Sequence, residues 1–118
     1  MAPNGIFYVF ANVSDLTRSK RFYGETLGWT LGTDEADVAG FAFGGGYLVL
    51  HTDERRDARG YAGGMHVAVK VDDVDAEHAR LATLGVRVSE LRDQPWGERN
   101  FYFDDPDGYV WAYGQPRR

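Results

Sequence analysis

The chain reads VSDLTRSKRFYGETLG from Val13 to Gly28, and this stretch carries the signals that begin and end a helix. Ser14-Asp15 suits an N-cap, because short polar side chains accept hydrogen bonds from the free amides of a first helical turn. The apolar side chains recur at roughly helical spacing: Leu16, Phe22, Tyr23 and Leu27. Gly28 stands where a C-cap glycine belongs. The stretch therefore predicts a helix over residues 17–27.

The segments on either side of this helix predict β-strands. Residues 6–13 are rich in β-branched and aromatic side chains, which favour a strand. Three further short extended segments follow the helix, separated by Asp and Gly clusters that are typical of turns: 29–32, 40–43 and 47–52. The predicted order of elements is βαβββ.

The second half of the chain repeats this order. Val13-Ser14-Asp15-Leu16 corresponds to Val71-Asp72-Asp73-Val74, 58 positions later, and Leu27-Gly28 corresponds to Leu84-Gly85, 57 positions later. Between these anchors lies a second helix pattern with one shared face: Val74, His78, Leu81 and Leu84. The strands expected around it cover residues 65–71, 86–91, 100–104 and 109–113. We therefore predict an α+β fold in a single domain, residues 1–118, with module one (5–52), a polar hinge (53–64) and module two (65–114).

Length and composition limit what this domain can be. A chain of 118 residues has the size of one domain and can bury a core without covalent staples. It contains no cysteine, which removes disulfides and cysteine-ligated zinc. No run approaches the roughly 20 apolar residues of a membrane span, and the N-terminus lacks the basic and apolar regions of a signal peptide. We expect a cytoplasmic protein without a membrane partner.

The charge of the chain argues against nucleic acid as a partner. There are 18 acidic and 13 basic side chains, so the net charge of -5 has the wrong sign to attract phosphate backbones. The densest basic run, Arg55-Arg56 with Arg59, is interleaved with acidic residues, and we interpret it as a solvated loop.

Three motifs resemble those of a known family. The stretch from Val13 to Tyr23, followed by Leu27-Gly28, resembles the opening of the vicinal oxygen chelate superfamily of glyoxalases, bleomycin-resistance proteins, fosfomycin-resistance enzymes and extradiol dioxygenases. Residues 65–69, MHVAV, are similar to the second-module strand of that family, and residues 101–109, FYFDDPDGY, to its late hairpin. The resemblance implies that the two modules form a cupped eight-stranded mixed sheet, the glyoxalase/bleomycin-resistance fold. It also implies a homodimer whose cups enclose ligand sites.

The same resemblance identifies the positions that hold metal ligands in the metal-using relatives. They correspond here to Tyr8, His66, Ala112 and Val49, or Leu50 if the register slips by one. A catalytic metal ion takes about three protein ligands from His, Asp, Glu or Cys, and only His66 qualifies. We therefore predict no metal ion and no other cofactor. One alternative stays open: His51 and His66 could form a partial site with an unidentified carboxylate.

Alternation along the strands predicts which side chains face the cup. Alternation that starts from Tyr8 and His66, together with the pattern of the family, predicts the following residues on the cup face: Tyr8, Phe10, Asn12, Tyr47, Val49, His51, His66, Ala68, Lys70, Asn100, Tyr102, Val110 and Ala112. The opposite, helix-covered face is apolar: Val9, Ala11, Val13, Val67, Val69, Val71, Phe101, Phe103 and Trp111. Aromatic residues on strands usually pack in a core. The polar residues among the first set favour a small-molecule pocket instead.

Other residues admit both a structural and a functional interpretation. Trp96, between Pro95 and Gly97, could cover the core or contact a ligand. Arg99 could pair with a ligand anion, although a salt bridge to Glu98 or Asp104 is the commoner outcome. His78, on the second helix, is expected to be structural.

Two functions follow from these expectations. The leading one is a protein that binds and sequesters a planar or aromatic compound without a metal ion, resembling the bleomycin-resistance branch. The alternative is a lyase, isomerase or dioxygenase of the same superfamily, with an atypical metal site or with His66 or Tyr8 as acid or base. Gly44-Gly45-Gly46 lacks the following Lys-Ser or Lys-Thr of a phosphate loop and predicts a hairpin turn.

Overall fold

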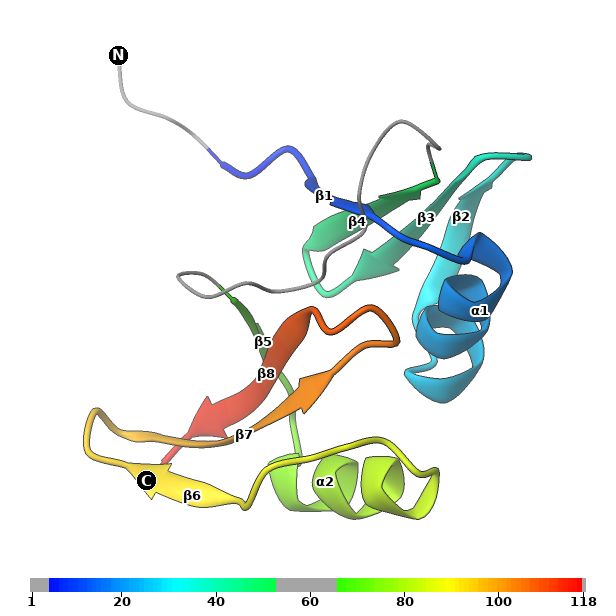
Figure 1. Ribbon diagram of the computed structural model, residues 1–118. Coiled ribbons are helices and arrows are strands. Elements are labelled where there is room, and N and C mark those ends of the chain that lie inside the picture. The colour runs from blue at the N-terminus through cyan, green and yellow to red at the C-terminus, as the bar shows by residue number, and fades with distance from the viewer. Residues whose placement is uncertain (1–4, 53–65, 118) are drawn as a thin grey trace. The chain divides into compact units, whose positions relative to one another are not determined.

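The computed structural model describes residues 5–52 and 66–117, and the chain divides into two compact units, Met1–Ala58 and Arg59–Arg118 (Figure 1). The first unit contains module one: β1 (Val9–Asn12), α1 (Leu16–Arg21), η1 (Phe22–Thr26), β2 (Thr30–Asp34), β3 (Val38–Phe43) and β4 (Gly46–His51). The second contains module two: β5 (Val67–Lys70), α2 (Val74–Thr83), β6 (Arg92–Gln94), β7 (Glu98–Asp104) and β8 (Val110–Pro116). The predicted α+β fold of two βαβββ modules is confirmed. The predicted hinge, 53–64, lies outside the described residues, as do Arg55, Arg56 and Arg59.

Each module forms a four-stranded mixed sheet with the same topology. The order is β1-β4-β3-β2 in module one and β5-β8-β7-β6 in module two. The first strand of each module pairs in parallel with its last strand, and the remaining pairs are antiparallel. The internal repeat read from the sequence is therefore a repeat of structure. The joining of the two sheets into one cup stays a prediction.

The helix boundaries follow from the predicted caps. The Asp15 carboxylate accepts a hydrogen bond from the Arg18 amide at 3.0 Å, and Asp73 accepts one from the Ala76 amide at the same distance. Gly28 has a φ of 77° after the first helix, in the left-handed region that glycine adopts without a Cβ penalty. Each cap thus satisfies backbone groups that a helix end leaves unpaired.

The sequence pattern predicts one continuous helix over residues 17–27, but the observed helix is not α-helical throughout. Its second half is the π-helical segment η1, in which the Leu27 amide donates to the carbonyl of Phe22, five residues earlier, at 2.9 Å. Gly24 lies in this segment, and a Cβ there would stand 3.3 Å from the Phe41 ring of β3. At Gly24 the segment η1 therefore lies close against β3. This close approach depends on tertiary packing and not on the local sequence pattern.

The prediction for the sixth strand was wrong. A strand was expected over residues 86–91, but β6 covers Arg92–Gln94. Val88 forms one isolated bridge with Phe103, and the Ser89 hydroxyl then accepts from the Tyr102 amide at 2.8 Å in place of a backbone carbonyl. The Ser89 amide still donates to the Tyr102 carbonyl at 2.8 Å, and the pairing then shifts by one residue before β6, where Arg92 lies opposite Asn100.

The core of each module lies between its sheet and its helix. In module one the largest fully buried side chains are Tyr23, Phe41, Leu48 and Leu50. In module two, Phe101, Phe103 and Trp111 are buried on the helix side, as predicted. His78 of α2 meets the Phe101 ring edge to face at 4.9 Å and its Nε2 lies 2.8 Å from the Ser89 carbonyl oxygen, which is a structural role. Among the described residues no helix is long and apolar enough to cross a membrane.

Candidate functional site

The strand register assigns the face of module one that lies opposite its helix, which we call the module-one open face. Phe10 of β1 is paired with Val49 of β4, and Asn12 with His51. Their neighbours in register, Val9, Ala11, Leu48 and Leu50, point to the helix side, where Leu48 and Leu50 are fully buried. Phe10 is 45% exposed, and its ring stacks on His51 with centroids 6.1 Å apart. The structure thus brings together four of the predicted residues.

Tyr8 and Tyr47 differ from each other in how tightly they are held. Tyr8 lies just before β1, is about half exposed, and meets the Phe7 ring edge to face at 5.6 Å. The Tyr47 hydroxyl accepts from the Thr33 amide at 3.0 Å and lies 2.8 Å from the Thr33 hydroxyl. Tyr47 therefore lies fixed across β3 and β2, whereas Tyr8 is open to solvent.

The open face of module two is the face opposite α2, and the register assigns it in the same way. Ala68, Ala112 and Tyr102 form one row across β5, β8 and β7. The next row contains Lys70, Gly114 and Asn100. His66, just before β5, is exposed and meets the Tyr102 ring edge to face at 5.3 Å. All the predicted residues of module two that lie in strands share this face.

Two residues that were predicted to contact a ligand, Asn100 and Trp96, form hydrogen bonds to protein groups on this face. Asn100 is only 2% exposed; its Nδ2 donates to Glu98 Oε1 at 3.1 Å, and its Oδ1 accepts from Gln94 at 2.9 Å. The Trp96 indole nitrogen donates to the same Glu98 oxygen at 2.9 Å, although the residue is 65% exposed. The amide of Asn100 and the N–H of Trp96 therefore bind protein rather than ligand, and only the Trp96 ring is free for stacking.

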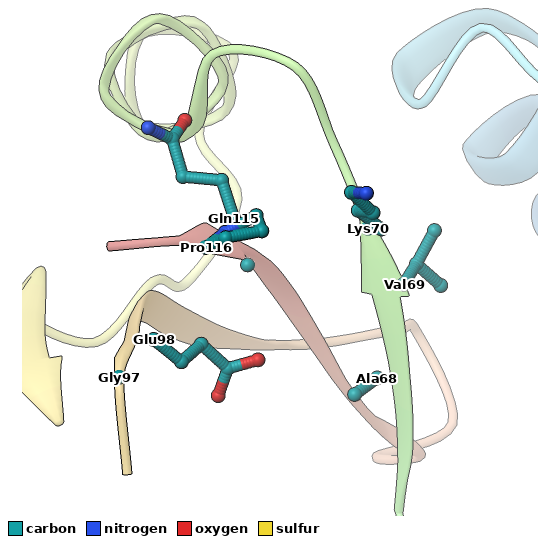
Figure 2. A pocket seen from close by; sticks show the side chains of 8 residues that line it. Ala68, Val69, Lys70, Gly97, Glu98, Gln115 and Pro116 are labelled. Carbon is teal, nitrogen blue, oxygen red and sulfur yellow. The ribbon is translucent and has the colours of Figure 1, made fainter. Parts of the chain in front are cut away.

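Glu98 is a residue of this face that was not among the candidates predicted from the sequence. Glu98 shares strand parity with Asn100 and Tyr102, so alternation along β7 would have placed it on the same face. A Cβ atom at Gly114 would lie 2.7 Å from Glu98 Oε2, so the carboxylate lies directly over the glycine. Figure 2 shows it directed from β7 into a pocket of about 310 Å³, which is lined by Ala68, Lys70, Glu98, Gly114 and Pro116 among others.

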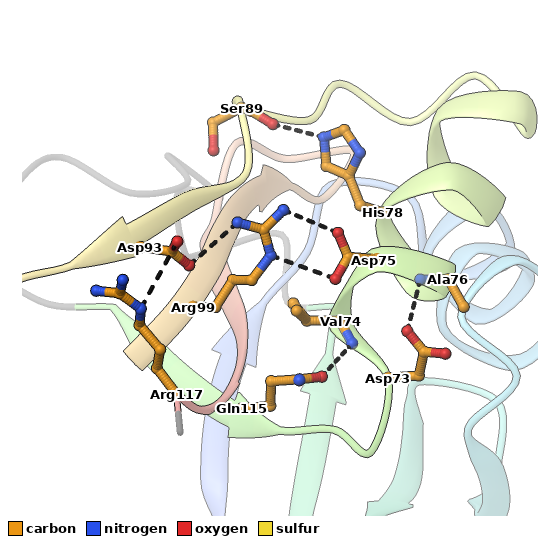
Figure 3. A network of polar contacts seen from close by, with 10 residues as sticks. All are labelled: Asp73, Val74, Asp75, Ala76, His78, Ser89, Asp93, Arg99, Gln115 and Arg117. Atoms are coloured by element: carbon orange, nitrogen blue, oxygen red, sulfur yellow. Dashed lines mark hydrogen bonds and ion pairs between the residues drawn. The ribbon is translucent and has the colours of Figure 1, made fainter. Parts of the chain in front are cut away.

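Arg99 does not belong to this face, nor does it pair with Glu98 or Asp104 as suggested from the sequence. Its guanidinium donates to the two carboxylate oxygens of Asp75 at 2.9 and 3.2 Å, and to Asp93 at 3.1 Å (Figure 3). The hydrogen bond from Arg99, together with its positive charge, holds the pKa of Asp75 below its usual value, against the opposing effect of desolvation. Arg99 thus ties α2 to β6 and β7 on the helix side.

The residues at the metal-ligand positions do not fit a metal ion. Val49, and not Leu50, lies on the open face, because Leu50 is buried on the helix side. Ala112 is 2% exposed between Ala68 and Tyr102. Neither side chain has a donor atom, which leaves His66 as the one imidazole or carboxylate in the set.

His51, the other histidine considered for a partial site, has a carboxylate nearby. Its Nε2 lies 3.7 Å from Asp37 Oδ2. Within residues 5–52 and 66–117, no three His, Asp or Glu side chains gather as a metal-binding group.

Comparisons with known proteins agree with this geometry. The chain is 30% identical over 115 residues to the uncharacterized protein YaeR of Escherichia coli strain K12, a match that covers 87% of this chain and 89% of YaeR. A glyoxalase/bleomycin resistance protein/dioxygenase from Nocardioides is similar in structure, with 26% identity, a TM-score of 0.80 and coverage of 100% of this chain and 87% of that one. TnmS3, an antibiotic binding protein from Streptomyces sp. CB03234, is 33% identical with a TM-score of 0.76, over 98% of each chain.

The sequence model of one family matches nearly the full length of the chain. Residues 5–113 match the Glyoxalase/Bleomycin resistance protein/Dioxygenase superfamily. This range takes in module one and module two as far as Tyr113 of β8. The chain therefore belongs to the glyoxalase/bleomycin resistance protein/dioxygenase superfamily.

Proposed function

We propose that this protein binds a planar or aromatic small molecule without a metal ion and sequesters it, as an antibiotic-resistance protein would. The observation that carries the proposal is the residue set at the family's metal-ligand positions. Val49 and Ala112 cannot coordinate, and tyrosine, as at Tyr8, is a rare ligand. With His66 as the one imidazole or carboxylate at these positions, the faces offer stacking and hydrogen bonding in place of Lewis-acid chemistry.

The composition of the open faces supports binding of an aromatic compound. Each face combines aromatic rings with a few polar groups, which is the usual composition of a small-molecule pocket. Phe10, Tyr8 and Trp96 expose much of their surface, and Tyr102 is half-buried beside His66. Stacking contacts with such rings contribute about 0.5–1.5 kcal/mol each beyond area burial. The similarity to TnmS3, which binds an antibiotic, points in the same direction.

The enzyme alternative rests on His66. A general acid or base needs a partner that fixes its tautomer and orientation. Within the described residues, His66 makes an edge-to-face contact with the Tyr102 ring, which supplies no such partner. A lyase, isomerase or dioxygenase activity is therefore the second candidate, and no specific contact favours it.

A fluorescence screen tests the proposal. A panel of aromatic natural products is titrated into the protein, and tryptophan quenching is followed. We expect binders whose quench shrinks in Trp96→Phe, and whose affinity falls roughly three- to tenfold in Tyr102→Ala because one stacking contact is lost. Leu84→Ala, an exposed apolar residue just after α2, is the matched control and should leave affinity unchanged. If a ligand binds tightly and neither Tyr102→Ala nor His66→Ala changes its affinity, the ligand lies elsewhere and the assignment of the open face as the binding site is overturned.

A further inference from the structure

We infer that the pocket of module two selects aromatic ligands that carry a protonated amine, with Glu98 as the counter-ion of that amine. The inference rests on the proposed function and adds the chemical class of the ligand. It concerns the pocket of about 310 Å³ over Gly114, which is large enough for a compound of two aromatic rings.

The Glu98 carboxylate is held in one orientation before any ligand arrives. Trp96 Nε1 and Asn100 Nδ2 both donate to Oε1, at 2.9 and 3.1 Å, and Gln94 holds Asn100 from the other side at 2.9 Å. Because both donors bind the same oxygen, the group cannot rotate without breaking two hydrogen bonds. A preorganised acceptor costs less to bind than one that must first be ordered.

The second oxygen of Glu98 is the one that faces the pocket. Oε2 lies over Gly114, where the missing side chain leaves room for it, and no described residue donates a hydrogen bond to it. A carboxylate oxygen that faces a pocket and receives no hydrogen bond from the described part of the protein is available to a charged N–H group of a ligand, and charge-assisted hydrogen bonds are the stronger ones. The exposed Trp96 ring beside it offers a further attraction to a cation.

Lys70 lines the same pocket and sets where the amine can lie. Lys70 is paired in register with Gly114, whereas Glu98 is paired with Pro116, and the two charged groups form no ion pair with each other. The ammonium of Lys70 repels a cation placed beside it and attracts a carbonyl or carboxylate. The ligand amine therefore belongs on the Glu98 side, and any acceptor group of the ligand on the Lys70 side.

Three matched probes test the inference on the full-length protein: 2-naphthylmethylamine, 2-naphthylmethanol and 2-naphthoate. Binding is followed at neutral pH by the ¹H–¹⁵N resonance of the Trp96 indole, which is assigned by its loss in Trp96→Phe. We expect the amine to bind about five- to tenfold more tightly than the alcohol, with a preference that falls as salt is added.

Glu98→Gln should bring the ratio of the two affinities to about one, because glutamine still accepts from Trp96 and Asn100 but carries no charge. Glu90→Gln is the control: it makes the same change of net charge at a side chain that is 84% exposed and does not line the pocket, and it should keep the ratio. Lys70→Met should strengthen binding of the amine about twofold and weaken binding of the naphthoate by a similar factor.

The outcomes separate this inference from the proposed function. If all three probes bind the face equally and Glu98→Gln changes no ratio, the pocket has no preference for amines; the inference fails and the proposed function stands. Each probe is titrated up to its own solubility limit. If no probe shifts the resonance of the Trp96 indole or those of the backbone amides of β5, β7 and β8, both the inference and the proposed function are overturned.

Discussion

A Cβ atom at Gly40 would overlap the hydroxyl oxygen of Tyr47 and lie 2.6 Å from its ring carbon Cε2. The Tyr47 side chain therefore lies flat across β3, in a notch that the glycine provides. Gly32 of β2 continues the notch, since a Cβ there would lie 2.7 Å from the same hydroxyl. The Thr33 amide and hydroxyl hold the end of the side chain. This contact fixes one aromatic ring of the module-one open face.

Gly40→Ala should displace Tyr47 and break its hydrogen bonds to Thr33. We expect a loss of about 1–3 kcal/mol in the free energy of unfolding, because overpacking and two lost hydrogen bonds combine. Urea unfolding measures it. Gly45→Ala, where a Cβ would meet nothing within 4 Å, is the control and should change stability by less than about 0.5 kcal/mol. Equal losses of stability in the two variants would contradict the interpretation that Gly40 provides a notch for Tyr47.

Asp75→Asn should reduce the dependence of stability on acid pH. The hydrogen bond from Arg99 lowers the pKa of Asp75 from its usual 3.8, so the native state binds the proton less tightly than the unfolded chain. The stabilisation is therefore present above the unfolded pKa and is lost as the pH falls through the lower, native one. Thermal unfolding between about pH 5 and 2 should show a shallower decline in the variant. An unchanged slope in Asp75→Asn would show that the Arg99 pair is not formed in solution.

The purified protein should carry no stoichiometric zinc, nickel, iron or manganese. The reason is that Val49 and Ala112 offer no donor atoms at two of the family's ligand positions. Elemental analysis measures metal content, and a chelator should leave the melting temperature unchanged. About one tightly held metal ion per chain, lost in His66→Ala, would favour the enzyme alternative instead.

We expect a homodimer in solution. Ile6 and Phe7, just before the edge strand β1, are 84% and 93% exposed, and exposed apolar groups next to a free strand edge favour association. Light scattering at micromolar concentration should give twice the mass of the chain, and Phe7→Ser should shift the equilibrium toward the monomer. A monomeric mass for the unaltered protein would contradict the prediction.

Local signals in the sequence determined the modular fold. Asp15 and Asp73 cap their helices, and Gly28 and Gly85 follow them with φ values of 77° and 84°, because capping depends on residues within one turn. The same signals, 57 and 58 positions apart, predicted the repeat. Strand alternation also separated the two faces of each sheet correctly, since side-chain direction follows from strand period alone.

Only the tertiary structure decided which partner each site residue has. Glu98 meets Trp96, Asn100 and Gly114, and Arg99 meets Asp75 rather than its neighbour Glu98, because adjacent residues on a strand point to opposite faces. The position of β6 likewise depends on how its segment pairs with β7, where the register changes by one residue between Val88 and Arg92. Arg99 and Asp75 are 24 residues apart, and Glu98 and Gly114 lie on different strands. Even the contacts of Glu98 with Trp96 and Asn100, which are near it in sequence, depend on side-chain packing that composition and periodicity do not encode.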